Sequence, residues 1–187
     1  AGLEWYRGAL YVTSAPYLWR MRDTDRDGVA DERHQLVGRF NYSGIGNDLH
    51  GPVLSPSGRL YWTHGRGGGG HEVFDANANL IEKNRTAAIF SCWPDGTDIR
   101  KHCDGGMDNP VELVFMPEGQ MIGSVNLLEM PVRDDALVHW MWGGVYPRRD
   151  VIGSISGLQR TGGLLGSTVS FGHVALSGVT RYRSRQF

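Results

Sequence analysis

The sequence predicts an all-β protein, and three observations support that prediction. Helical periodicity is nearly absent, glycine accounts for 27 of the 187 residues, and aromatic residues are frequent, with 6 Trp, 7 Tyr and 6 Phe. Glycine supplies the backbone conformations of tight turns, and aromatic side chains favour the pleated surface of a strand. A chain of this length normally forms one domain, so residues 1–187 are expected to form a single domain of short strands.

A recurring unit, a turn followed by a short aromatic-rich strand, runs along the chain. Its copies are residues 8–13, residues 57–63 and, more weakly, residues 118–124. Apolar segments at residues 51–55 and 111–115 precede the last two copies, and Pro-x-Gly turns at residues 56–58 and 117–119 join them. Each of these pairs predicts a β-hairpin. Further strands are expected at residues 18–21, 88–91 and 178–183.

The spacing of the recurring unit indicates a β-propeller. The turn glycines of the three copies, Gly8, Gly58 and Gly119, are 50 and 61 residues apart. That spacing fits a four-stranded propeller blade with loop insertions. A closed propeller needs at least four blades, so residues 1–187 are expected to be a partial propeller of about three blades from a longer chain. A small β-sandwich that closes on itself is the alternative.

Composition and charge exclude several classes of protein. The formal net charge is −1, which gives no general electrostatic attraction to nucleic acid or to an anionic membrane. No apolar run is long enough to span a bilayer, and the first residues lack the features of a signal peptide. Within residues 66–87, the glycine-rich start at 66–70 lacks the Lys-Ser/Thr of a phosphate-binding loop, and we expect a flexible loop.

The two cysteines, Cys92 and Cys103, flank a turn at residues 93–97. In an exported protein such a pair can form a disulfide across a hairpin, although the turn would make the pair diagonal. Two buried free thiols fit the sequence equally well, and both interpretations stay open. No spacing of Cys and His residues indicates a zinc site.

The acidic segment at residues 23–32 has the pattern of a calcium-binding loop. Carboxylates at alternating positions precede Gly28, whose tight turn allows one short segment to supply several hard oxygen ligands. The expected ligands are Asp23, Asp25, Asp27, the carbonyl of Val29, and Asp31. The twelfth position is His34 rather than the Glu that closes an EF-hand loop, with Glu32 as a substitute in a different geometry. A solvated acidic turn between two strands is the alternative.

Three segments, in order along the chain, resemble the soluble glucose/sorbosone dehydrogenases, which use pyrroloquinoline quinone (PQQ) and fold as six-bladed propellers. They are residues 49–63, residues 105–115 and residues 134–147. The chain resembles in particular a branch described as membrane-bound dehydrogenases of Planctomycetes and Verrucomicrobia, through residues 19–31, 105–112 and 173–178. The resemblance implies that residues 1–187 belong to a six-bladed propeller.

The resemblance also implies a function and a set of site residues. It implies a sugar or polyol oxidoreductase in the periplasm, or otherwise outside the cytoplasm, with calcium and PQQ as cofactors. A c-type haem domain elsewhere in the longer chain is the implied electron acceptor. His50 matches the general base, which takes the hydroxyl proton while hydride moves to the quinone. The candidate cofactor contacts are Asp108, Asn109, Arg66, and His64, which flanks the glycine-rich loop.

Two positions depart from the family pattern. Arg66 stands where the family has an aspartate that orients the base, and an arginine cannot accept the imidazole N–H. Asp108 stands where an arginine contacts the quinone, and a carboxylate repels a tricarboxylated cofactor unless a cation lies between them. These departures keep a second interpretation open, in which the chain is a non-catalytic propeller module that binds a glycan or a protein partner.

Overall fold

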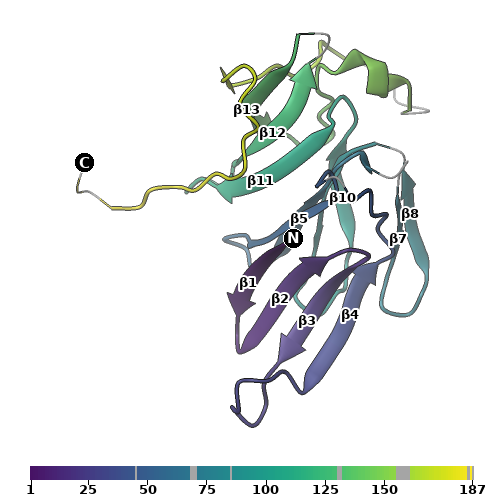
Figure 1. Cartoon of the computed structure of the whole chain (residues 1–187), viewed down its shortest axis with the longest axis vertical. Helices are drawn as coiled ribbons and strands as arrows, with labels where there is room; N and C mark the ends of the chain where they lie inside the picture. The colour runs from purple at the N-terminus through teal and green to yellow at the C-terminus, as the bar shows by residue number, and fades with distance from the viewer. Residues whose placement is uncertain are drawn as a thin grey trace.

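The computed structural model describes residues 1–44, 46–67, 71–84, 86–129, 132–154, 161–184 and 186. Within these ranges the chain is all-β, as the sequence predicts, and its strands form three open antiparallel sheets (Figure 1). A short 3₁₀ helix, η2 (Arg149–Ser154), lies after the long strands of the third sheet. No helix in the described ranges is long and apolar enough to cross a membrane.

The first sheet begins as a meander of four consecutive strands. They are β1 (Gly2–Tyr6), β2 (Ala9–Ser14), β3 (Tyr17–Arg22) and β4 (Glu32–Gly38). Gly8 has a φ of 73° in the tight turn between β1 and β2, a conformation that residues with a side chain rarely adopt. Because side chains alternate along a strand, Tyr11 is buried on one face while Leu3 and Trp5 are 68% and 64% exposed on the other.

A hairpin extends the outer edge of this first sheet. β7 (His71–Phe74) and β8 (Leu80–Asn84) pair with each other, and β7 pairs with β4 at Gly38 and Phe74. Val73 is fully buried, and the backbone N–H of Arg39 donates to the Glu72 carbonyl at 3.0 Å. The expectation of a flexible loop is therefore wrong for residues 71–84, whereas residues 68–70 lie outside the described ranges.

The second sheet lies between the other two and is covered on both faces. Its strands are β5 (Leu49–Leu54), β6 (Leu60–His64), β9 (Ala88–Cys92) and β10 (Arg100–Asp104), in the order β10-β9-β6-β5. Every residue of β6 and β9 is buried. Trp62 and Phe90 pack in the core shared with the first sheet, while Tyr61 and Ile89 pack in the core shared with the third. Strands covered on both faces are apolar at consecutive positions, as here.

The third sheet completes the stack. Its strands are β11 (Asn109–Phe115), β12 (Met121–Glu129), β13 (Asp134–Trp140) and β14 (Val169–Ser170). Leu113, Val125 and Val138 pack against the second sheet. The hairpins expected around the two Pro-x-Gly turns are confirmed as β5–β6 and β11–β12. The described residues do not form the alternative, a small β-sandwich that closes on itself, because three open sheets are stacked and the outer face of the first sheet exposes Leu3 and Trp5.

The first strands of the three meanders, β1, β5 and β11, lie side by side near the middle of the molecule (Figure 1). They line a cavity of about 810 Å³ together with residues 179–181 and Arg183. The strand expected at residues 178–183 is not formed. Instead, this segment contacts β11 through a side chain, because Nη1 of Arg181 donates to the Phe115 carbonyl at 3.1 Å.

The two cysteines are buried free thiols. Cys92 lies in the core between the first and second sheets, and Cys103 lies in the core between the second and third. Their side chains thus point to opposite faces of one sheet, which separates the sulfur atoms. Burial raises the pKa of the Cys92 thiol to about 12. The structure therefore selects the free-thiol interpretation.

Candidate functional site

A bulge at the beginning of β5 positions His50. His50 pairs with Thr63 of β6, and the pairing then shifts between His50 and Val53, so the bulge follows His50 directly. Gly51 lies in this bulge with a φ of 86°, which residues with a side chain rarely adopt, and a Cβ would crowd the Tyr61 carbonyl oxygen at 3.2 Å. The hydroxyl of Thr13 donates to the Gly51 carbonyl and ties this bulge to the first sheet.

His50 contacts the first residue of β11. Its Nε2 lies 3.1 Å from Oδ1 of Asn109, which orients the ring. Burial lowers the pKa of His50 from its usual value, while the hydrogen bond with Asn109 opposes this shift. Because Oδ1 is an acceptor, the neutral ring carries its proton on Nε2, and Nδ1 is the nitrogen that can accept a proton. The structure thus brings together two residues that the sequence singles out separately.

His50 also faces a cavity at the boundary between the first and second sheets. The cavity has a volume of about 390 Å³, and its lining includes Ser14, Tyr42 and Asp48. Asp48 is buried, and its carboxylate accepts a hydrogen bond from the backbone N–H of Ser43 at 2.7 Å. A hydroxyl-bearing ligand in this cavity would meet the imidazole and several hydrogen-bonding groups.

Asp108, next to Asn109, lies at the centre of a buried ion-pair cluster. Nη2 of Arg66 donates to its Oδ2 at 3.0 Å, and Nη1 of Arg148 donates to the same oxygen. The side-chain amide of Asn47 donates to its Oδ1, and the Arg66 backbone N–H donates to its carbonyl at 2.7 Å. The carboxylate is therefore fully paired.

This cluster changes what the two departures from the family pattern mean. Asp108 is only 3% exposed and two guanidinium groups neutralise it, so it does not present a bare negative charge to a ligand. The Arg66 side chain is 39% exposed and carries positive charge to the surface of the cluster. Arg66 is thus the member of this set that is placed to meet an anionic group.

His64 lies in the core. It is fully buried, its ring stacks on Phe40 with centroids 5.4 Å apart, and Nε2 lies 3.3 Å from the Asn41 carbonyl oxygen. Burial lowers its pKa to about 4. These contacts make His64 a packing residue between the first and second sheets rather than a group open to a cofactor.

The acidic segment forms the loop between β3 and β4. Each of Asp23, Asp25 and Asp27 brings one carboxylate oxygen to within 4.8 Å of the others. Asp31 faces Thr24, whose backbone N–H and hydroxyl donate to Oδ2 at 2.7 and 2.8 Å. Three of the five expected ligands therefore converge, and loop backbone N–H groups donate to these three carboxylates as Thr24 does to Asp31.

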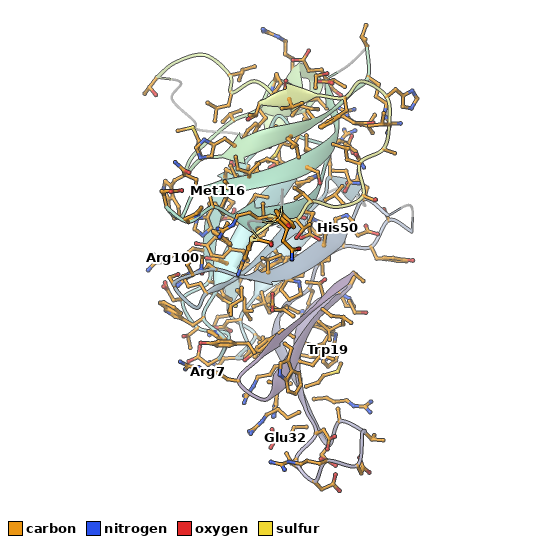
Figure 2. All side chains as sticks on the ribbon, turned by 90° about the vertical axis from the view of Figure 1, so that its left-hand side faces the viewer. Arg7, Trp19, Glu32, His50, Arg100 and Met116 are labelled. Atoms are coloured by element: carbon orange, nitrogen blue, oxygen red, sulfur yellow. The ribbon has the colours of Figure 1, made fainter. Side chains whose placement is uncertain are left out.

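This loop lies far from His50. Figure 2 places Glu32, at its end, at one extremity of the molecule and His50 near the middle. Val29 is exposed, and the His34 side chain is 57% exposed, with Nε2 3.9 Å from the Glu32 carboxylate. An ion bound at this loop would act on the stability of the first sheet and would not touch the groups around His50.

The sequence analysis missed Arg148, which belongs to the Asp108 cluster, and a separate buried carboxylate, Asp135. Arg148 is buried beside Asp108, and its Nη1 also donates to the Leu127 carbonyl at 3.2 Å. Asp135 accepts hydrogen bonds from the backbone N–H groups of Leu127 at 2.8 Å and Ala175 at 2.8 Å. Asp135 also pairs with the neighbouring Arg133, and these hydrogen bonds lower its pKa to about 2.

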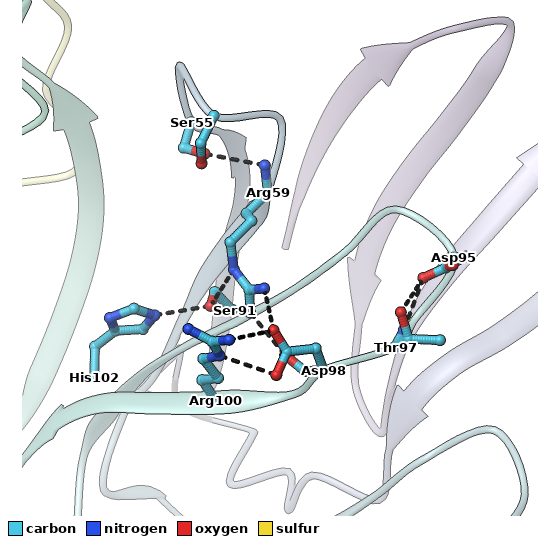
Figure 3. A network of polar contacts seen from close by, with 9 residues as sticks. Ser55, Arg59, Ser91, Asp95, Thr97, Asp98, Arg100 and His102 are labelled. Atoms are coloured by element: carbon cyan, nitrogen blue, oxygen red, sulfur yellow. Dashed lines mark hydrogen bonds and ion pairs between the residues drawn. The ribbon is translucent and has the colours of Figure 1, made fainter.

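A second buried polar network lies in the second sheet (Figure 3). The Ser91 hydroxyl lies 2.8 Å from Nε2 of His102 and accepts a hydrogen bond from Nη2 of Arg59 at 2.9 Å. A Ser–His pair can serve as a nucleophile and base, but Ser91 is fully buried. Burial, followed by the positive charges of Arg59 and Arg100, lowers the pKa of His102 to about 4. This pair is structural.

No protein-family model matches the chain, and no curated protein matches it. The sheets and the surroundings of His50 therefore carry the functional argument.

Proposed function

We propose that the three sheets are consecutive blades of a β-propeller that is completed to six blades by further sequence. Two observations support this. The strands β1, β5 and β11 lie side by side around one cavity, as the innermost strands of neighbouring blades do. The outer face of the first sheet exposes Leu3 and Trp5, an arrangement that suits the packing of another sheet.

We propose further that this propeller oxidises a sugar or polyol, with a quinone of the PQQ type as hydride acceptor. The observation that carries the proposal is the neutral, half-buried His50, held by Asn109 and open to a cavity. The imidazole takes the proton from a substrate hydroxyl, while the hydrogen on the adjoining carbon leaves as hydride. Asn109 keeps the ring in position for that proton transfer.

The proposed contacts of an anionic cofactor are Arg66 and Asn109, neither of which is among the residues that line the His50 cavity. Arg66 is partly exposed and is placed to pair with a carboxylate, while Asp108 is already neutralised by Arg66 and Arg148. Arg66 and Asn109 would hold PQQ, which supplies the hydride acceptor when it is bound. His64 takes no part in this proposal, because it is packed in the core.

Calcium at the β3–β4 loop forms a separate part of the proposal. Asp23, Asp25 and Asp27 supply converging hard oxygens, the ligands that calcium prefers. A bound ion would remove the mutual repulsion of these carboxylates and stabilise the loop. The periplasmic location and the c-type haem domain as electron acceptor come from the family resemblance alone.

The proposal is tested on the full-length protein by calorimetric titration of PQQ with calcium present, together with dye-coupled oxidation of a broad panel of sugars and polyols. We expect PQQ to bind and at least one substrate to turn over. His50→Ala should lower kcat by about 10²- to 10⁴-fold, the usual contribution of a general base, while PQQ still binds.

The exposed histidine His34 provides the matched control, and His34→Ala should leave turnover unchanged. Failure of PQQ to bind the full-length protein, or full turnover by His50→Ala, would overturn the proposal. In either case His50 would be a structural residue at the beginning of β5.

A further inference from the structure

A groove opens at the edge of the molecule opposite His50. Arg7 lies in the turn at one end of the β1–β2 hairpin, whereas Ala1 and Ser14, at its other end, line the cavity beside His50, and Figure 2 shows Arg7 and His50 well apart. The groove has a volume of about 520 Å³, which lies within the range of about 300–1,000 Å³ common for small-ligand sites. The lining residues used below are Tyr6, Arg7, Tyr11, Arg20, Trp93 and Asp95.

Trp93 forms one wall of the groove as an exposed aromatic platform. It follows β9 directly and is 38% exposed. The guanidinium carbon of Arg59 lies 4.7 Å from the centre of its ring, whereas Arg59 itself is buried and does not line the groove. The indole is therefore held from beneath by a cation–π contact and remains accessible from the groove.

The turn that carries Trp93 is rigidly built. The backbone N–H of Trp93 donates to the Thr97 carbonyl at 2.9 Å. The Asp95 carboxylate accepts hydrogen bonds from the backbone N–H and the hydroxyl of Thr97 at 2.9 and 2.7 Å. Figure 3 shows Arg59 joined to Asp98 below this turn, at 2.8 Å. The platform is thus fixed before any ligand arrives, which reduces the entropy lost on binding.

The opposite wall combines aromatic rings with positive charge. The guanidinium carbon of Arg7 lies 5.0 Å from the centre of the Tyr6 ring. Arg20 is the cross-strand partner of Tyr11, so the two side chains lie on the same face of the first sheet and both line the groove. Two arginines therefore face one carboxylate, Asp95, whose Oδ1 is already engaged by Thr97. The groove is positively charged, although the whole chain carries a net charge of −1.

We propose that this groove binds an acidic oligosaccharide, a short chain that contains uronic acid residues. The flat apolar face of a pyranose ring would stack on Trp93, and the uronate carboxylates would pair with Arg7 and Arg20. Charge complementarity selects an acidic chain over a neutral one. The inference does not depend on the oxidoreductase proposal, because no described residue lines both this groove and the His50 cavity.

The test is calorimetric titration of trigalacturonate, with the neutral trisaccharide cellotriose as the comparison, into the full-length protein at low and high salt. We expect trigalacturonate to bind, cellotriose to bind at least about tenfold more weakly, and salt to weaken the trigalacturonate interaction. Trp93→Ala should weaken binding by about tenfold, and Trp93→Tyr, which retains a ring, should recover part of the loss. Arg20→Gln should weaken trigalacturonate binding and reduce its salt dependence.

Two control variants distinguish this site from others. Trp142, which is 65% exposed and does not line the groove, gives the matched tryptophan control, and Trp142→Ala should bind as the parent protein does. His50→Ala should also leave binding unchanged. The inference is overturned if trigalacturonate does not bind, if cellotriose binds as tightly, or if Trp93→Ala and Arg20→Gln both bind as the parent does.

Discussion

Oδ1 of Asn109, the first residue of β11, lies 3.1 Å from Nε2 of His50, the second residue of β5. This contact joins the second and third sheets at the point where His50 meets its cavity. Asn109 is therefore a positioning residue in the proposed reaction, because it acts on substrate only through the imidazole.

The pKa of His50 should follow the charge at position 109. A carboxylate next to an imidazole favours the protonated form, so Asn109→Asp should raise the pKa of His50 by about 1 unit. A two-dimensional NMR titration of the imidazole signals measures this shift directly. The acid limb of the kcat/KM profile should move to higher pH by the same amount. Asn77→Asp, in the exposed β7–β8 turn, is the control and should leave the His50 titration unchanged.

Asp108→Asn should strongly destabilise the fold. The substitution leaves Arg66 and Arg148 facing a neutral amide, and breaking a buried ion pair in this way lowers the free energy of unfolding by about 3–5 kcal/mol. Urea denaturation measures the change. The control is Asp150→Asn, since Asp150 pairs with Arg148 but its side chain is 54% exposed, and a loss of only about 0–1 kcal/mol is expected. Equal losses for the two variants would contradict the cluster as described.

Acid should destabilise the protein before its carboxylates titrate. The folded pKa values of His64 and His102 are about 4, below the ordinary value of 6.5, so protonation favours the unfolded chain. The free energy of unfolding should therefore be highest above pH 6.5. It should decrease as the pH is lowered from 6.5 to 4, by about 1.4 kcal/mol per pH unit for each histidine.

The variant His102→Gln distinguishes the contribution of His102 to this pH dependence from that of His64. It removes one titrating group and keeps an acceptor for the Ser91 hydroxyl. Urea midpoints measured from pH 7 to pH 4.5 should show a shallower slope for this variant. A slope identical to that of the parent would mean that His102 does not titrate with unfolding.

Calcium should raise the stability of the protein through the β3–β4 loop. A ligand present at 100 times its dissociation constant adds about 2.7 kcal/mol to the free energy of unfolding. Asp25→Asn should abolish the effect, because it removes one of three converging carboxylates. The matched control is Asp75→Asn in the exposed turn between β7 and β8. Thermal unfolding with and without calcium is the measurement, and an unchanged Tm in the parent protein would argue for a solvated acidic turn.

Local signals explain which strands the sequence predicts. The Pro-x-Gly turn at residues 56–58 and the apolar segments on either side lie within a few residues of one another, so one short segment specifies the β5–β6 hairpin. The β7–β8 hairpin is short and largely polar, and its register depends on pairing with β4, which lies much earlier in the chain. No pattern within residues 71–84 predicts the pairing of β7 with β4.

The candidate site also contains features that local sequence predicts and features that only long-range packing determines. The pattern of residues 23–27 predicts converging carboxylates because the turn that joins them is local. Arg148, one partner of Asp108, is 40 residues away in the sequence. The residues around Arg148 contain no pattern that predicts this ion pair. The burial of His64 against Phe40 is likewise decided by the packing of two sheets and cannot be predicted from the residues around His64.

The β7–β8 hairpin has a consequence for how the molecule unfolds. It arises between two neighbouring strands of the second sheet, β6 and β9, and yet hydrogen-bonds to the first sheet through Arg39 and Glu72. The two sheets are thus interlocked by main chain as well as by side chains, and they should lose structure as one cooperative unit. The same hairpin covers the Gly38 end of the free edge of β4, and an uncovered strand edge can pair with neighbouring molecules and cause aggregation.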